Sequence, residues 1–350
     1  MVEKMDTLHV YGVDVIVKLQ ATFKGNSEYM LALSHLGDPR NAFLIYFPLA
    51  YFCHHSVGKR VLFLAAIAEW LNAVLKWFLH GERPYWWVNE EKSHWNTTVR
   101  LQQYKLTCET GPGSPSGHAM VTSAVWFVMV SSVLHYAIEK HRAVWSVLLW
   151  TWFSVFMLCV SVSRCFIATH FPHQVLAGTF TGILLAWVVC TQISTNKLQL
   201  KHYVITSLWL LVSSLGVYSL LQQLGVDPAW SISKASRWCA RPEWIHLDTT
   251  PLFALMRDAG QILGLGIGVC LIKEPILSSI GKLLCIPITI GLTLTSEQIK
   301  VPVVSSTVIF YTMALYKHTM LPIVVVGVVP RIMSILFSGK VEKETKTKNS

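Results

Sequence analysis

Three short segments of the chain hold cations and histidines in patterns suited to anion chemistry. Lys76 precedes Arg83 by seven positions, Ser-Gly-His occupies 116–118, and Arg164 precedes His170 by six positions. An arginine presents a planar fork of donors that matches the oxygens of a phosphate-like anion. An imidazole can act as a nucleophile, a general acid or a general base. If the fold brings the segments together, they form a site that binds an oxyanion and attacks its central atom.

Composition indicates the class of protein that must position these residues. Hydrophobic residues make up 53% of the 350-residue chain and charged residues only 14%. The apolar stretches run for about 15 to 22 residues, near the length that crosses a bilayer as a helix. We therefore expect an all-α, polytopic membrane protein. No removable signal peptide is evident at the N-terminus, so the first span is expected to target the chain.

The net charge of +10 is also consistent with a membrane protein. Many of the bases lie in short connections between apolar stretches, where the positive-inside bias of membrane proteins places them. We therefore expect membrane lipids, and no nucleic acid, around this chain.

Nine spans are predicted near residues 31–53, 61–79, 119–138, 143–162, 174–193, 203–223, 253–272, 283–297 and 303–337. The last stretch exceeds the length of one span and contains Pro322 and Pro330, so it is expected to be a kinked or partly re-entrant helix. The sequence predicts one membrane-embedded domain, 1–350. Its parts outside the membrane are an N-terminal segment, two polar loops and a tail, at 1–30, 80–117, 224–252 and 338–350.

Two signals predict the orientation of these parts. Asn96 begins an acceptor sequon for N-glycosylation, which requires a lumenal loop. The bases of the short connections fall on the opposite side, as expected for the cytosol. Lys346 and Lys348 resemble a dilysine signal for return to the endoplasmic reticulum, which must face the cytosol. We expect both polar loops and the N-terminal segment to be lumenal and the tail to be cytosolic.

The spacing of Lys76 and Arg83 predicts how they meet. Seven residues make close to two helical turns, so both side chains are expected on one helix face. Pro84 disfavours α geometry at Arg83, so the helix should end there with the guanidinium at the lumenal mouth of the span. Alternatively, Lys76 is a cation near a span end that reaches toward lipid headgroups.

The second segment predicts a helix N-terminus. The apolar run that follows His118 places Ser116 and Gly117 at the start of the third span. Free backbone N–H groups there form an anion site, and Gly117 permits close approach. A lumenal turn with Ser116 as an ordinary N-cap, and with His118 incidental, remains the alternative.

The third segment places His170 beside another helix start, because Pro172 is typical of a first helical turn. Alone, His170 would be interpreted as a packing histidine. Together with Arg164 and the other two segments, it indicates cations and histidines that converge on one membrane face.

The three segments together resemble the signature of the type-2 phosphatidic acid phosphatase superfamily, which includes the vanadium haloperoxidases. The flanking sequences WLNAVLKWFLHGERPYWWV, CETGPGSPSGHAM and ATHFPHQVLAG resemble the glucose-6-phosphatase catalytic subunit family. The resemblance runs from about residue 35 to 272. It implies nine transmembrane helices, an endoplasmic reticulum location and a lumenal active site.

The resemblance also implies the chemistry. Glucose 6-phosphate would be hydrolysed through a phosphohistidine, with His170 as nucleophile and His118 as general acid and base. Its phosphate would be bound by the cations and the first N–H groups of the helix, a set that comprises Lys76, Arg83, Arg164, Ser116 and Gly117. No metal or other cofactor is expected, since the three cations supply the positive charge. Functional coupling to a glucose-6-phosphate transporter is also expected.

One position departs from the wider superfamily, which has an aspartate four residues after the nucleophilic histidine. This chain has Gln174 there, whose side-chain oxygen can still accept from the ring N–H but adds no negative charge to raise the basicity of the histidine. Asp38, Glu109 or a backbone carbonyl could replace the aspartate, and the sequence does not choose among them.

Other residues permit simpler interpretations. Tyr85, Trp86 and Trp87 are typical of an aromatic belt at the membrane interface, with a sugar-stacking platform as the alternative. Cys108 and Cys239 both fall in predicted lumenal loops, where a disulfide is one of two outcomes.

Three other functions are less consistent with the sequence. A lipid phosphatase would share the phosphate site but not the glucose-6-phosphatase-like flanks. A sugar-phosphate transporter would need paired repeats and a midplane site, which are not evident. A pseudoenzyme is disfavoured because every signature residue is present.

Overall fold

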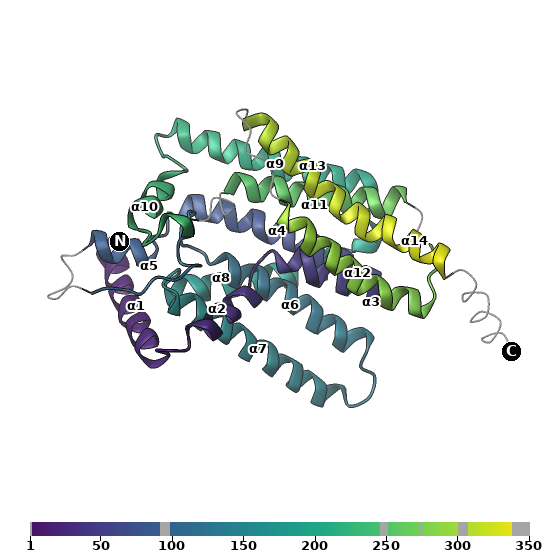
Figure 1. Ribbon diagram of the computed structural model, residues 1–350, viewed down its shortest axis with the longest axis horizontal. Coiled ribbons are helices and arrows are strands. Elements are labelled where there is room, and N and C mark those ends of the chain that lie inside the picture. The colour runs from purple at the N-terminus through teal and green to yellow at the C-terminus, as the bar shows by residue number, and fades with distance from the viewer. Residues whose placement is uncertain (1, 92–98, 246–250, 273–274, 300–306, 338–350) are drawn as a thin grey trace. The chain divides into compact units, whose positions relative to one another are not determined.

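All regular elements in the described part of the chain are helices, which confirms the predicted all-α class (Figure 1). The computed structural model describes residues 2–91, 99–245, 251–272, 275–299 and 307–337. The chain divides into two compact units. Unit 1 comprises 1–39, 68–187 and 214–254, and unit 2 comprises 40–67, 188–213 and 255–350.

Unit 1 contains the three segments singled out by the sequence. Its complete helices are α1 (Val2–Thr22), α2 (Ser27–Leu36), α5 (Pro84–Glu90), α6 (Gly117–Tyr136), α7 (Arg142–Phe166) and α10 (Trp230–Trp238), with a 3-10 turn at Pro242–Trp244. The helix α7 packs beside α6, and α1 and α2 also pack on it. The short helix α5 lies between α10 and α1, both of which it contacts (Figure 1).

Unit 2 holds the remaining helices. They are a π-helical turn (Ala42–Tyr46), α3 (Phe47–Cys53), a 3-10 turn (Thr195–Lys197), α12 (Ser279–Gln298), α13 (Thr307–Ile323), a second π-helical turn (Val324–Val328) and α14 (Val329–Leu336). Four helices have residues in both units: α4 (His55–Leu79), α8 (Pro172–Gln192), α9 (Leu200–Gln223) and α11 (Pro251–Leu271).

Within the described residues, eight helical stretches are long and apolar enough to cross a membrane, close to the predicted nine. They are 55–90, 117–136, 142–166, 172–192, 200–223, 252–271, 279–298 and 308–336. Each predicted span from 61–79 onward overlaps one of them.

The predicted first span at 31–53 is wrong as one continuous helix. The helix α2 ends at Leu36, with Gly37 as its C-cap, and the chain becomes helical again only at Ala42. Gly37 and Pro39 are residues that interrupt helices. The stretch 42–53 remains as a shorter apolar helix.

The last predicted span is a continuous helical run from Thr307 to Leu336. Pro322 lies inside α13, and a π-helical turn follows it at once. A proline removes one backbone donor from the helix, and a π turn is a common way to accommodate the local change. The described part of this stretch is therefore an irregular helix rather than a re-entrant segment.

The aromatic residues after Arg83 are part of the core of unit 1. Tyr85 and Trp86 are 0% exposed and Trp87 is 3% exposed, so they do not form a belt against lipid. They pack with Val13 and Ile16 of α1 in one hydrophobic cluster. Because they lie beside Arg83 in sequence, their burial fixes the backbone that presents the guanidinium.

Candidate active site

The spacing of Lys76 and Arg83 predicted one continuous helix between them, but the chain leaves the helix before it reaches Arg83. The helix α4 ends at Leu79, and His80 adopts a left-handed conformation with φ 46°. Arg83 is extended, with φ −111° and ψ 147°, and caps α5. Lys76 and Arg83 therefore do not share a helix face. The expected effect of Pro84 on Arg83 is confirmed, but the helix has already ended four residues earlier.

Backbone carbonyls fix the guanidinium of Arg83. Its Nε donates to Gly111 O at 2.7 Å, Nη2 to Pro112 O at 3.2 Å and Nη1 to Thr169 O at 3.1 Å. The side chain is fully buried. These bonds connect the Arg83 segment to the loop before α6 and to the loop before α8. They place the charge between the second and third segments of the sequence signature.

The second arginine comes from the last turn of α7. Arg164 is 0% exposed, and its Nη1 donates to the Ser34 hydroxyl at 2.7 Å. Its Nη2 donates to the Glu109 carboxylate. Its Nε is buried and has no hydrogen-bond partner among the residues that the structure describes. That donor is oriented but uncommitted, as expected in a site for an external anion.

The turn after α7 brings His170 back to this arginine. Ala168 is left-handed, with φ 56°, although it is not a glycine. The N–H of Thr169 then donates to Arg164 O at 3.2 Å. A non-glycine residue in this region is uncommon and is often found near functional sites. The turn places His170 two residues before Pro172, which begins α8 as predicted.

The tautomer of His170 follows from its two partners. Its Nδ1 lies 2.8 Å from Gly113 O, which can only accept, so Nδ1 carries the proton. Its Nε2 lies 3.4 Å from Arg83 Nη1, which can only donate. The lone pair of Nε2 therefore faces the arginines. Burial lowers the pKa of His170 well below its ordinary value, and the charges of Arg83 and Arg164 lower it further.

The structure shows which group orients the imidazole of His170, since Gln174 replaces the aspartate of the wider superfamily. The side chain of Gln174 bonds to the backbone: its Nε2 donates to Glu82 O at 2.7 Å, and its Oε1 accepts from Phe171 N–H at 3.1 Å. The backbone carbonyl of Gly113 orients the ring instead. Gly113 sits where a Cβ would meet the Glu82 carbonyl and the Gln174 side chain, so a glycine is needed for this close approach.

Glu109 lies at the centre of the cluster, a position the sequence did not assign to it. Its carboxylate pairs with Arg164 and lies 3.0 Å from Arg83 Nη2. It is also 3.8 Å from His118 Nδ1 and 4.0 Å from His170 Nε2. Although burial alone raises the pKa of Glu109, the charges of Arg164 and Arg83 hold it well below its ordinary value. The carboxyl group is therefore ionised.

The second segment begins α6 as expected. Ser116 is the N-cap, and its side chain accepts from Ala119 N–H. Its own backbone N–H donates to Gln174 O at 3.0 Å. That N–H is engaged, which leaves the N–H of Gly117, the first residue of α6, as the predicted phosphate contact from this helix start.

His118 lies on the open side of the cluster. Its side chain is 15% exposed and that of Glu109 is 11% exposed, whereas that of His170 is 0% exposed. Lys76 is half-buried and interacts electrostatically with Arg83, Glu109 and Arg164. His118 and Glu109 are therefore partly accessible to solvent, whereas His170 is not. The structure brings together all the predicted site residues except Asn96, which lies outside the described residues.

A covalent link, which the sequence left open, supports the loop that carries Glu109. Cys108 and Cys239 form a disulfide, which joins that loop to the end of α10. The Ser231 hydroxyl of α10 also donates to Thr110 O at 2.8 Å. Helix α10 is thus attached on both sides of Glu109.

The N-terminal helix α1 supports the loop that carries His170. Gln20 of α1 donates to Phe166 O at 2.7 Å, at the end of α7. Phe171, next to His170, stacks on His9 at 4.4 Å between ring centroids. No sequence signal predicts this role, because α1 lacks the signature residues and contacts the site loops through tertiary packing.

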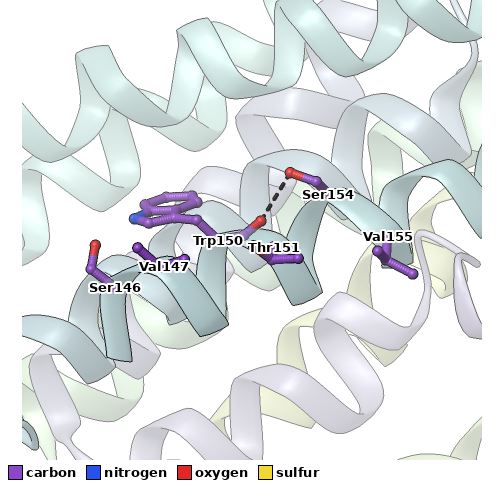
Figure 2. A pocket seen from close by; sticks show the side chains of 6 residues that line it. All are labelled: Ser146, Val147, Trp150, Thr151, Ser154 and Val155. Atoms are coloured by element: carbon purple, nitrogen blue, oxygen red, sulfur yellow. Dashed lines mark hydrogen bonds between the residues drawn. The ribbon is translucent and has the colours of Figure 1, made fainter. Parts of the chain in front are cut away.

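An open pocket on α7 contains none of the candidate active-site residues (Figure 2). It is lined by Ser146, Val147, Trp150, Thr151, Ser154 and Val155, all from one helix. None of them titrates near neutral pH.

No group of three or more histidines, cysteines or acidic residues in the described part of the chain could hold a metal ion, and a metal-free reaction stays a prediction.

The fold and the cluster define a class of membrane-embedded phosphatase-like proteins. Residues 57–198 match the PAP2 superfamily. The chain is 38% identical to mouse glucose-6-phosphatase 2, covering 98% of this chain and 100% of that protein. It is 38% identical to dog glucose-6-phosphatase catalytic subunit 1, covering 96% and 98%. It is 39% identical to bovine glucose-6-phosphatase 3, covering 94% and 96%.

The chain belongs to the glucose-6-phosphatase family of the PAP2 superfamily. No solved structure matches it.

Proposed function

We propose that this protein hydrolyses glucose 6-phosphate to glucose and inorganic phosphate. One observation carries the chemistry: two buried arginines and two histidines surround a single anionic group, with the His170 Nε2 lone pair directed into the same space. Relatives named glucose-6-phosphatases over nearly the whole chain support the substrate.

In the first step, Nε2 of His170 attacks phosphorus in line. A bond forms between Nε2 and phosphorus as the bond between phosphorus and the sugar oxygen breaks. His118 gives a proton to the leaving oxygen. The Nδ1–H of His170 stays bonded to Gly113 O and stabilises the charge that the ring gains. The cations of Arg83, Arg164 and Lys76 stabilise the phosphoryl oxygens.

In the second step, water attacks the phosphohistidine. His118, now neutral, takes a proton from the water, whose oxygen bonds to phosphorus while the bond to Nε2 breaks. Inorganic phosphate is released, and both histidines return to their starting states. The greater exposure of His118 suits a residue that must reach both the leaving group and water.

The cellular setting is part of the proposal. We place the protein in the endoplasmic reticulum membrane, with the site and Asn96 in the lumen and the tail in the cytosol. The contacts of α1 with the site loops support placing the N-terminal segment on the same side as the site. Lumenal hydrolysis would require glucose 6-phosphate to cross the membrane, which supports functional coupling to a transporter of that sugar phosphate.

Substrate identity is tested with permeabilised microsomes that contain the protein. Glucose 6-phosphate should be hydrolysed faster than mannose 6-phosphate, and phosphatidic acid should be a poor substrate. Faster hydrolysis of phosphatidic acid would make the protein a lipid phosphatase of the same superfamily.

Orientation is tested with an endoglycosidase. The protein should lose one glycan, and an Asn96→Gln variant should not respond. A mobility shift that persists in the variant would overturn the loop assignment.

A further inference from the structure

Glu109 contacts the same side chains that the proposed function gives to the substrate phosphate. We infer that its carboxylate is an internal anion that occupies the phosphate site between turnovers and that substrate phosphate displaces. The inference rests on the proposed function for the identity of the displacing anion.

The contacts of the carboxylate define where it sits. One oxygen pairs with Arg164 and the other lies 3.0 Å from Arg83 Nη2. The two imidazoles lie at 3.8 and 4.0 Å. A planar carboxylate between two guanidinium groups presents oxygens much as a phosphoryl group would. The two arginines and both histidines thus converge on Glu109.

Space excludes simultaneous occupancy. For in-line attack, phosphorus must come within about 3 to 3.5 Å of the nucleophile. The Glu109 oxygen on the Arg83 side lies 4.0 Å from His170 Nε2. A phosphorus atom with its oxygens cannot enter between them while this carboxylate remains. Glu109 must leave for Nε2 to react.

The movement must be a rotation of the side chain. The Glu109 N–H donates to Thr107 O at 2.9 Å, and its carbonyl accepts from the Tyr85 hydroxyl at 3.1 Å. The disulfide at Cys108 anchors the preceding residue. With the backbone held, the two methylenes of the side chain allow the carboxylate to swing toward the open side, where it is 11% exposed.

The exchange has a role in turnover. Arg83 and Arg164 are fully buried, and an unpaired buried cation is costly. Glu109 neutralises part of this charge when phosphate departs. It therefore keeps the arginines in place and competes with product phosphate, which favours release.

The test is the binding of inorganic phosphate to the purified full-length protein in detergent, measured by calorimetry without hydrolysis. Glu109→Gln removes the competing charge and should bind phosphate at least about fivefold more tightly, in the usual range for coupled binding. Phosphate should inhibit the variant at correspondingly lower concentration. Glu90→Gln is the matched control, since Glu90 pairs with Lys234 outside the cluster, and its phosphate affinity should equal wild type.

Equal or weaker binding by a folded Glu109→Gln protein would overturn the inference, because Glu109 would then not compete with phosphate for the arginines. If that variant does not fold, Glu109→Asp replaces it. Its carboxylate keeps the charge but is withdrawn by one methylene, so phosphate should again bind more tightly, and unchanged or weaker binding would again overturn the inference. If Glu109→Gln binds phosphate more tightly but the wild-type protein does not hydrolyse glucose 6-phosphate, only the proposed substrate is contradicted.

Discussion

Two clusters of charged side chains in unit 1 invite comparison. The inner cluster surrounds Glu109 and contains Arg83 and Arg164. The outer cluster surrounds Lys234 of α10, whose Nζ lies 2.7 Å from both Glu82 and Glu90. Both clusters join segments that lie far apart in the sequence, and both consist of ion pairs between basic side chains and carboxylates.

The clusters differ in burial and in charge balance. Side chains of the outer cluster are about a quarter exposed, and two carboxylates share one lysine. In the inner cluster both arginines are buried, and one carboxylate faces two guanidinium groups with Lys76 nearby. Exposed pairs contribute little to stability, whereas buried excess charge demands a counterion. The difference teaches that an unbalanced buried charge, rather than the number of ion pairs, marks the anion site.

The largest expected effect is on the inner cluster. Arg83→Lys should lower kcat/KM for glucose 6-phosphate by about a hundredfold or more, since a single ammonium group cannot reproduce a fork held by three carbonyls. The cost corresponds to roughly 2.7 to 4 kcal/mol of transition-state stabilisation, as for loss of an oxyanion donor. Steady-state kinetics on protein shown to be folded by thermal melting provide the measurement. Wild-type turnover would reduce Arg83 to a structural or headgroup contact.

A shift in pH dependence should follow from the same charge. Because burial and Arg83 lower the pKa of His170, the nucleophile stays neutral as pH falls through the ordinary imidazole range. Removing the positive charge should raise this pKa and move the acidic limb of kcat/KM to higher pH. Arg83→Met tests this against Arg83→Lys, which keeps the charge, with a phenolic phosphate as substrate. Identical acidic limbs in the two variants would show that Arg83 does not set the ionisation of His170.

The smallest effect is expected in the outer cluster. Lys234→Met keeps the apolar stem but removes the charge between α10 and α5. It should change stability by no more than about 1 kcal/mol, as for ion pairs that solvent still reaches, and kcat/KM by no more than about twofold. Thermal melting and kinetics measure both quantities. A tenfold loss of activity would show that Glu82, next to Arg83, couples the two clusters.

Local sequence signals predicted much of the site. The apolar run after His118 predicted a helix start at Ser116 and Gly117, and Pro172 predicted the start of α8. The apolar stretches predicted most spans. These signals succeed because capping, proline geometry and apolar length act over a few residues of contiguous chain.

Non-local contacts could not be predicted in this way. Nothing local to Glu109 shows that its carboxylate meets two arginines from other segments. The helix bearing Lys76 ends at Leu79 through a left-handed His80, where a glycine would have been the usual signal. Tyr85 to Trp87 resemble a membrane belt in sequence, and packing against α1 and α10 makes them core.

The central claim is that His170 is the nucleophile and His118 the general acid and base. Trapping of labelled phosphoenzyme tests it most directly, with a labelled phenolic phosphate whose leaving group needs little protonation. The His118→Ala protein should accumulate label, because its first step is restored while water attack stays slow. The bond should be labile to acid and stable to base, as for a phosphoramidate, and the His170→Ala protein should hold no label. Label on His170→Ala, or an acid-stable label as expected for a phosphoserine at Ser116, would contradict the account.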